Sequence, residues 1–184
     1  MDMNTMTNLL QLRFQCDADL AGNPDTLHSQ TLYLGYLGTS LICWCSIDQG
    51  SIATSTAESE FEAVNHNLKA EVISNRGTLE QMGWIQQPTI IEEDNKACVD
   101  SSLASHMTRG LRHLAVTENF LQEKSADGTC KTVKIDSKNN NSDIGTKRLD
   151  FPLFIHLMFQ LTDRTLRPKV QGERTEKLNV QLIH

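Results

Sequence analysis

The chain has 184 residues, of which 39% are hydrophobic, and its formal net charge at pH 7 is −6. This length is sufficient for one domain with a buried core, and no apolar run approaches the roughly 18 to 20 residues of a membrane helix. The opening residues MDMNTMTNLLQ have no basic segment typical of a secretory signal, and the five cysteines form no C-x-x-C pair, which argues against a disulfide framework or a zinc site.

The chain begins with three predicted strands. Apolar and polar residues alternate from Leu10 to Cys16, which is typical of a half-buried strand, and two acids, Asp17 and Asp19, follow in the word CDADLAG. The segment QTLYLGYLGTSLICWCSI predicts two more strands that reverse direction at residues 38–40. These three strands are expected to form an antiparallel meander.

A long helix is predicted to start after Ser55. The word Ser55-Thr56-Ala57-Glu58 is a capping box, in which the first and last side chains bond to backbone N–H groups at the helix start. Four apolar residues then recur at the spacing of one helix face: Ala57, Phe61, Val64 and Leu68. Gly77 is expected to interrupt the helix before a short second segment that ends near Met82.

The second half of the chain alternates between strands and helices. PTIIEED at 88–94 predicts a strand that ends in acids, KACVDSSLAS predicts a short helix, and RHLAVTENFLQEK at 112–124 predicts another. GTCKTVKI at 128–135 predicts a fifth strand, SKNNNSD a loop, and a helix is expected from Asp143 to Pro152, continued by the apolar segment LFIHLMFQL. This order predicts an α/β fold, with helices packed on a mixed sheet.

Four acids fall where predicted strands end or helices begin. They are Asp17, Glu60, Asp94 and Asp143. Because such positions converge on one edge of an α/β sheet, the four carboxylates would repel one another unless cations lay between them. Carboxylate oxygens suit Mg²⁺ or Mn²⁺, and two such ions about 4 Å apart can activate a water and stabilise the leaving oxygen in phosphodiester cleavage.

Helix geometry separates Glu60 from the acids beside it. At 100° per residue, Glu60 lies about 70° from the centre of the apolar face, whereas Glu62 lies well round on the far side. Glu58 is engaged as the capping partner. The residues alone leave a second interpretation open, in which all three acids are present because they favour the helix N-terminal dipole.

Charge is unevenly distributed along the chain. Residues 1–100 contain 4 Lys and Arg against 14 Asp and Glu, whereas residues 101–184 contain 13 against 9. An acidic half beside a basic half suits a metal site next to a phosphate-binding surface, although solvated faces arranged by chance would give the same balance. Five basic residues are the candidates for phosphate contacts: Lys131, Lys134, Lys138, Lys147 and Arg148.

Several short sequence motifs follow one another in a fixed order: CDADLAGNPDT, ICWCS, STAESEFEAV, EEDNKACV, RHL and DIGTK. In this order they resemble the ribonuclease H domain of copia-type, retrovirus-related retrotransposon polyproteins. That family carries an S-D-A-D-W-A-G word, an S-S-A-E-S-E-Y word, a D-N-Q-S-A word and an A-D-I-L-T-K word in the same order. The resemblance covers about residues 10–160.

The resemblance implies a ribonuclease H-like fold, an α/β fold in which a five-stranded mixed sheet, with three antiparallel strands first, carries helices on both faces. The domain is expected over 9–161, after a short leader at 1–8 and before a polar, flexible tail at 162–184. The resemblance also implies cleavage of the RNA strand of an RNA–DNA hybrid during reverse transcription, with two Mg²⁺ ions or Mn²⁺ as cofactors. By position, the family's metal-binding acids fall on Asp17, Glu60, Asp94 and Asp143, whereas Asp19 is not counted as a ligand.

The chain departs from the family words at positions on the substrate side. Leu20 replaces a Trp, Leu32 replaces a Gly, and the GLRH word at 110–113 replaces R-T-K-H. None of these changes removes a predicted metal ligand. No His lies between Lys131 and Asp143, so the mobile histidine of cellular ribonucleases H is absent from this segment, and His113 is interpreted as structural.

A second reading of the chain is an inactive or binding-only fragment of a decayed polyprotein. The sequence lacks the capsid, protease, integrase and polymerase segments that precede this domain in such polyproteins, so it is expected to be a terminal fragment, a decayed insertion or a separate gene model. An integrase core is disfavoured because its last acid is usually a glutamate on a late helix. The expected partners are an RNA–DNA hybrid and a reverse transcriptase domain, with no membrane, and the expected location is a cytoplasmic retrotransposon particle or the nucleus.

Overall fold

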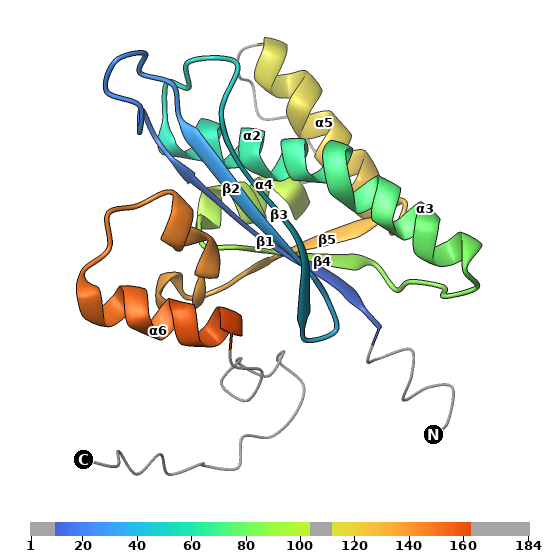
Figure 1. Cartoon of the computed structure of the whole chain (residues 1–184). Helices are drawn as coiled ribbons and strands as arrows, with labels where there is room; N and C mark the ends of the chain where they lie inside the picture. Colours follow the sequence, from blue (N-terminus) through green and yellow to red (C-terminus); the bar gives the residue numbers. More distant parts are fainter. Residues whose placement is uncertain (1–9, 104–111, 163–184) are drawn as a thin grey trace, which may run out of the picture.

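A computed structural model of the chain describes residues 10–103 and 112–162 (Figure 1). Within them, five strands form one sheet in the order β3-β2-β1-β4-β5. The strands are β1 (Leu12–Asp19), β2 (Gln30–Leu37), β3 (Ser40–Asp48), β4 (Thr89–Glu93) and β5 (Cys130–Lys134). The first three are antiparallel, and β4 and β5 run parallel to β1, which confirms the predicted mixed sheet.

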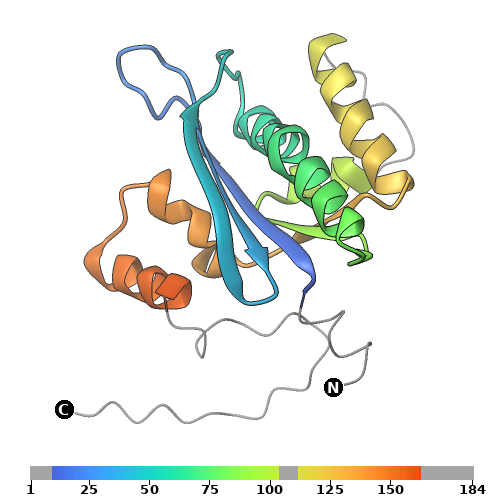
Figure 2. The same cartoon turned by 45° about the vertical axis from the view of Figure 1, so that its right-hand side comes forward.

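Helices lie on both faces of this sheet, as predicted (Figures 1 and 2). On one face lie α2 (Thr56–Asn67), α4 (Lys96–Leu103) and α5 (Arg112–Ala126). On the other lie a 3₁₀ turn, η3 (Asn141–Gly145), and α6 (Phe151–Thr162), with a shorter turn, η2 (Ser137–Asn139), before them. The proposed leader at 1–8 and the tail from 163 lie outside the described residues, as does the side chain of His113.

The main core lies between the sheet and α2. It is built by the alternating apolar residues of β1, the helix face predicted from the sequence, and neighbours from β4, α4, α5 and β5: Leu12, Phe14, Cys16, Phe61, Val64, Leu68, Ile91, Cys98, Leu121 and Cys130. A smaller cluster of Leu32, Leu34 and Tyr36 lies on the other face, with Leu161 of α6 packed against it. These two clusters hold the helices in place on either side of β1.

A close approach between η3 and β2 fixes the loop that carries Asp143. A Cβ atom added to Gly145 would lie 2.7 Å from Cδ1 of Leu32, so a larger residue would require either the Leu32 side chain or η3 to shift. Leu32, one of the departures from the family words, is therefore accommodated by a glycine on the opposing turn.

The long helical segment is not interrupted at Gly77, contrary to expectation. A π-helical turn, η1 (Leu68–Val72), joins α2 to α3 (Ile73–Gln81), and the segment ends at the predicted place, with Gly83 at φ +83°. A glycine inside a helix costs only about 1 kcal/mol. Packing of Leu79 and bonds from Arg76 to the carbonyl of Gln87 and the hydroxyl of Thr89 hold the helix beyond that point.

The predicted helix from Asp143 to Pro152 is also wrong. Asp143 lies in the short 3₁₀ turn η3, and the helix that contains the apolar segment begins only at Phe151. Asp150 caps it, since its side chain accepts from the Leu153 N–H at 3.0 Å. Proline fits the first turn of a helix, where its missing N–H is not needed, so Pro152 marks a start and not an end.

Helix α6 is strongly apolar but only partly covered. Leu157 is fully buried, whereas Phe151 and Phe159 are more than half exposed. Among the described helices, including this one, none is both long enough and apolar enough to cross a bilayer.

Candidate metal centre where strands β1 and β4 separate

The candidate site lies where two parallel strands part. β1 pairs with β4 only from Arg13 to Gln15, whereas its pairing with β2 continues to Asp19. Beyond Gln15 the β4 side of β1 is free for other groups, and this is the point where the sheet changes from antiparallel to parallel pairing. Ligand sites of α/β sheets typically form at the carboxyl ends of strands at such a point.

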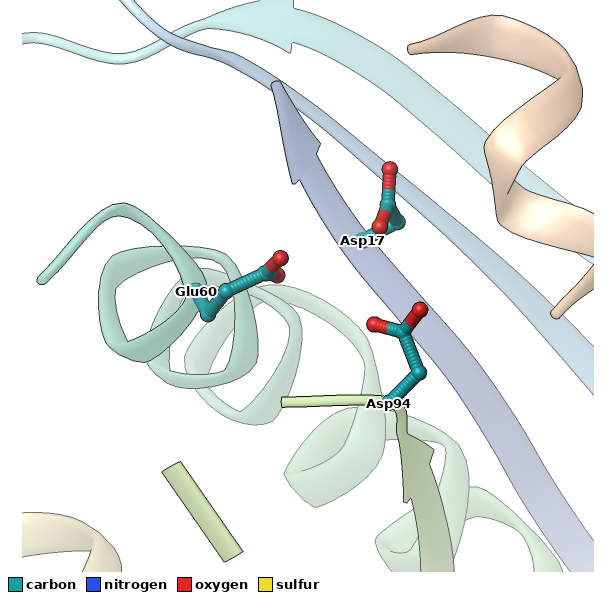
Figure 3. A group of neighbouring side chains, drawn as sticks. All are labelled: Asp17, Glu60 and Asp94. Atoms are coloured by element: carbon teal, nitrogen blue, oxygen red, sulfur yellow. The ribbon is translucent and has the colours of Figure 1, made fainter. Parts of the chain in front are cut away.

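Three of the four predicted acids meet there (Figure 3). One carboxylate oxygen each from Asp17, Glu60 and Asp94 all lie within 4.8 Å of one another. Asp17 comes from the last part of β1, Glu60 from the first turns of α2, and Asp94 from the residue after β4. Asp17 and Glu60 are buried and Asp94 is partly exposed, so the cluster opens toward solvent on the Asp94 side.

The N-terminus of α2 sets the direction of Glu60. Ser55 is the N-cap, and its hydroxyl accepts from the Glu58 N–H at 3.2 Å. The Glu58 carboxylate accepts from the N–H of Thr54 at 2.6 Å, so Glu58 is engaged in capping as predicted, with Thr54 as its partner in place of Ser55. Glu62 turns outward to the hydroxyl of Ser51. The predicted helix phase, with Glu60 at the edge of the core, is therefore confirmed.

Glu60 is a buried acid with an unused oxygen. Its side chain is 3% exposed, and its Oε2 atom has no hydrogen-bond partner among the described residues. A buried carboxylate without a partner is costly unless it is protonated or bound to a cation. Burial and the charge of Glu93 raise the pKa of Glu60 to about 11, and the nearby charges of Asp17 and Asp94 act in the same direction.

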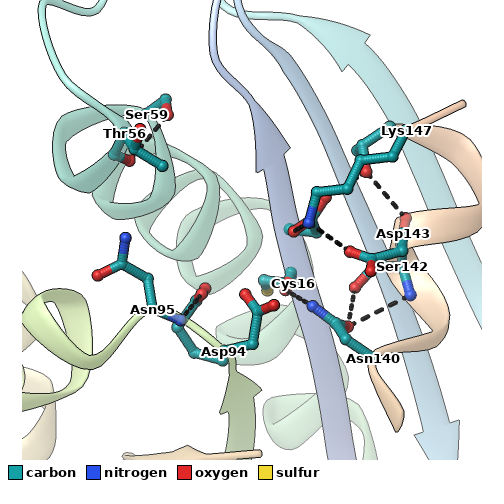
Figure 4. A network of polar contacts seen from close by, with 12 residues as sticks. Cys16, Thr56, Ser59, Asp94, Asn95, Asn140, Ser142, Asp143 and Lys147 are labelled. Atoms are coloured by element: carbon teal, nitrogen blue, oxygen red, sulfur yellow. Dashed lines mark hydrogen bonds and ion pairs between the residues drawn. The ribbon is translucent and has the colours of Figure 1, made fainter. Parts of the chain in front are cut away.

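Asp143 reaches the site through a lysine (Figure 4). The Nζ atom of Lys147 donates to Oδ1 of Asp17 at 2.8 Å and to Oδ1 of Asp143 at 2.6 Å. Thr146 donates its hydroxyl to the other oxygen of Asp17. Asp143 is thus linked to Asp17 and is not part of the cluster of three. Burial raises the pKa of Asp143 to about 7, although the hydrogen bond from Lys147 opposes this rise.

The loop carrying Asp143 is anchored by buried amides. Asn140 is fully buried, and its side chain donates to the carbonyl of Cys16 at 3.0 Å, just past the last β1 residue that pairs with β4. Its Oδ1 atom accepts from the backbone N–H and the hydroxyl of Ser142, which caps η3. Asn141 donates to the hydroxyl of Tyr36 at 3.3 Å on the same face.

The comparisons with known proteins give one group of similar proteins and one fold. No family model matches the chain. It is 31% identical over 136 residues to the retrovirus-related Pol polyprotein from transposon TNT 1-94 of Nicotiana tabacum, which covers 74% of this chain and 10% of that protein. It is 28% identical over 152 residues to the Pol polyprotein from transposon RE1 of Arabidopsis thaliana, covering 80% of this chain and 10% of that protein.

Among solved structures, the chain is similar to LC11-RNase H1 in complex with an RNA/DNA hybrid, with a TM-score of 0.54 at 12% identity over 71% of this chain and 88% of that one. A structure of LC11-RNase H1 isolated from compost gives a TM-score of 0.55 at 12% identity, over 73% and 91%. The chain is similar to one segment of retrovirus-related Pol polyproteins from transposons and has the ribonuclease H-like fold. This ribonuclease H-like domain spans about a tenth of the length of the curated relatives it matches.

The basic residues predicted to contact phosphate lie in different settings in the ribonuclease H-like domain. Lys131 and Arg148 are exposed, and Lys138 is exposed and paired with Asp136 at 2.9 Å. The amine of Lys134 donates to the backbone carbonyl of Asp94, so it steadies the end of β4. Lys147 lies inside the acidic site, and phosphate contact by any of the five stays a prediction.

Two residues near the centre of the ribonuclease H-like domain were not found from the sequence. Glu93 is fully buried, and while Oε1 accepts from the Asn95 N–H, its Oε2 atom has no partner among the described residues. Burial raises the pKa of Glu93 well above its usual value. Asn140 falls in the segment predicted as a loop, although an Asn two residues before a Ser and three before an Asp is a usual start for a capped turn.

Asp19, the second acid of the opening word, lies beside the centre and outside the cluster. Its backbone carbonyl accepts from the Gly22 N–H at 3.2 Å, which closes the turn after β1. Burial, followed by the charge of Asp17, raises the pKa of Asp19, whereas Lys147 lowers it. Asp19 therefore helps to form the turn after β1 and contributes to the electrostatic field around the site, in keeping with its interpretation from the sequence.

Proposed function

We propose that the ribonuclease H-like domain is a metal-dependent endonuclease that cleaves the RNA strand of an RNA–DNA hybrid during reverse transcription. The observation that carries this proposal is the cluster of Asp17, Glu60 and Asp94, with oxygens within 4.8 Å of one another and a buried oxygen on Glu60 that has no partner in the described part of the chain. The fold it shares with LC11-RNase H1, a structure of which contains an RNA/DNA hybrid, supports the substrate class.

The residues present fit a hard divalent cation. The donors are carboxylate oxygens, the ligands that Mg²⁺ and Mn²⁺ prefer, and Glu60 retains an oxygen that no described residue satisfies. Asp17, Glu60 and Asp94 would hold the cation, with Asp143 as the fourth acid of the site. A divalent cation bound there would lower the pKa of a water molecule and offset the negative charge that develops on the phosphodiester.

The chain itself supplies orientation and charge. The bond from Thr146 and the ion pair with Lys147 fix Asp17, while the capped start of α2 fixes Glu60. Asp94, the least buried of the three, lies on the side from which a phosphodiester would enter. The exposed amine of Lys131 and guanidinium of Arg148 would contact phosphates, and contacts to 2′-hydroxyls would distinguish RNA from DNA.

The wider biological setting is part of the same proposal. We place the domain beside a reverse transcriptase domain of a parent polyprotein, in a cytoplasmic retrotransposon particle or in the nucleus. The second candidate function is binding without cleavage. It is favoured by the departure at Leu20, an exposed residue next to Asp19, which leaves the metal ligands intact.

The test is cleavage of an RNA–DNA hybrid whose RNA strand is end-labelled, by the full chain in millimolar Mg²⁺ and again in excess chelator. We expect RNA fragments with Mg²⁺ only, and no fragments from a DNA duplex. Asp94→Asn should be inactive, and Asp100→Asn, an exposed aspartate of α4, is the matched control. A hybrid that is bound but left intact in Mg²⁺ would establish the binding-only function instead.

A further inference from the structure

Lys147 lies between two of the four predicted metal ligands. Its ammonium group is 2.8 Å from Oδ1 of Asp17 and 2.6 Å from Oδ1 of Asp143. The Asp17 side chain is fully buried, that of Asp143 is 7% exposed, and that of Lys147 is 36% exposed. A positive charge on a half-buried side chain therefore already occupies the space that these two carboxylates share.

The same contact separates the four acids into two groups. Among the described residues, the group with oxygens close enough to share one cation contains Asp17, Glu60 and Asp94. Asp143 is outside this group and is bonded to Lys147. Asp17 belongs to both groups, because its carboxylate lies near Glu60 and Asp94 and also accepts from the ammonium.

A second metal ion would have to displace this ammonium. A divalent cation held by Asp17 and Asp143 would need the oxygens that Lys147 now uses, and two cations bound to the same carboxylate repel each other.

We propose that Lys147 is a built-in cation that takes the place of a second metal ion in the free domain. The free domain then holds one divalent cation at Asp17, Glu60 and Asp94, and a second binds only when the amine of Lys147 leaves Asp17 and Asp143. This inference rests on the proposed metal centre and deepens it, because it states how many ions the chain accepts and which residue sets that number.

The test counts bound ions in the absence of nucleic acid. Mn²⁺ is titrated into the full chain and followed by electron paramagnetic resonance, and Mg²⁺ binding is measured by calorimetry. We expect one ion in the wild-type chain, with any second site at least tenfold weaker. Lys147→Gln should bind two ions, the second at least tenfold tighter than in the wild type, a change of about 1.4 kcal/mol.

Two variants control for charge and for the loss of a lysine. Lys147→Arg keeps the positive charge and should still bind one ion. Lys124→Gln removes a lysine that also contacts two carboxylates, those of Glu123 and Asp127, on another part of the surface, and it should bind as the wild type does. If Lys147→Gln does not fold, which circular dichroism would show, Lys147→Met, with a side chain of similar length, takes its place.

The outcomes separate this inference from the proposed function. Two ions of similar affinity in the wild type, or an unchanged count in Lys147→Gln, would overturn the inference even if the hybrid is cleaved. One ion in the wild type and two in Lys147→Gln would support it even if no cleavage occurs. A wild-type chain that binds no ion would overturn both the inference and the metal centre beneath it.

Discussion

Replacing Glu60 with glutamine should stabilise the metal-free domain while it destroys the metal site. In the fold the pKa of Glu60 is about 11, against 4.5 for an ordinary glutamate, so at pH 7 the side chain must take up a proton when the chain folds. Each pH unit between 4.5 and 7 makes this uptake more costly by about 1.4 kcal/mol, or about 3 kcal/mol in all. Glutamine has the same shape and no such cost, and its amide would donate to the neighbouring carboxylates.

The measurement is a pair of thermal melts, in excess chelator and in millimolar Mg²⁺, together with the hybrid-cleavage rate. In chelator, Glu60→Gln should melt several degrees above the wild type, since 1 kcal/mol corresponds to about 2–4 °C for a chain of this size. Mg²⁺ should raise the melting temperature of the wild type by mass action and that of the variant much less. Cleavage should fall by orders of magnitude, because a ligand is lost.

Glu58→Gln is the matched control, two residues away on the same helix. Glu58 accepts bonds from the N–H and the hydroxyl of Thr54, and a glutamine carbonyl can accept both, so the loss should be a few tenths to about 1 kcal/mol. Its Mg²⁺ response and cleavage rate should be those of the wild type. An inactive Glu58→Gln beside an active Glu60→Gln, or a destabilised Glu60→Gln in chelator, would contradict the assignment of Glu60 as the buried metal ligand.

Three further predictions follow from the same site. Asp94→Asn should leave the melt in chelator close to that of the wild type and remove hybrid cleavage, and near wild-type cleavage in Mg²⁺ would exclude Asp94 as a ligand. In chelator, the free energy of unfolding should fall as pH rises from about 5 to 9, by about 1.4 kcal/mol per pH unit for each extra proton that the folded chain holds. The extra protons are on Glu60 and Asp143, whose folded pKa values of about 11 and 7 lie above their unfolded values of 4.5 and 3.8. Mg²⁺ affinity should rise over the same pH range, and chelator melts that improve with pH would contradict the assignment. Asn140→Ala should cost about 1–3 kcal/mol in denaturant unfolding because it leaves the Cys16 carbonyl and Ser142 without their buried partner, whereas an equal loss in Asn139→Ala would show that the anchor is not specific.

The five strands and the mixed sheet could be predicted because local patterns and short motifs agreed. Alternation in β1 and the reversal after β2 depend on near neighbours, and the capping box at Ser55 fixed the start and phase of α2. Where the local structure depends on tertiary packing, the prediction from the sequence was wrong. Gly77 stays helical because Leu79 and Arg76 are held by other elements, and Asp143 lies in a short turn because Asn140 and Gly145 pack against the sheet.

The candidate site was partly visible in the sequence for a similar reason. Asp17, Glu60 and Asp94 come together because strand ends and a helix start meet at one place in this fold, which periodicity can indicate. The bond between Lys147 and Asp17 joins residues 130 positions apart in the chain, and no local pattern reports such a contact. Burial of Glu93 likewise depends on how β4 packs against the helices. The adjacent acids Glu92 and Glu93 indicated only the end of a strand, and not which of the two is buried.

The most direct test of the metal centre is the anomalous difference map of a crystal of the full chain grown with Mn²⁺. We expect a peak within coordination distance of oxygens from Asp17, Glu60 and Asp94. A map without a peak there, from a crystal in which the three carboxylates are ordered, would exclude this metal centre.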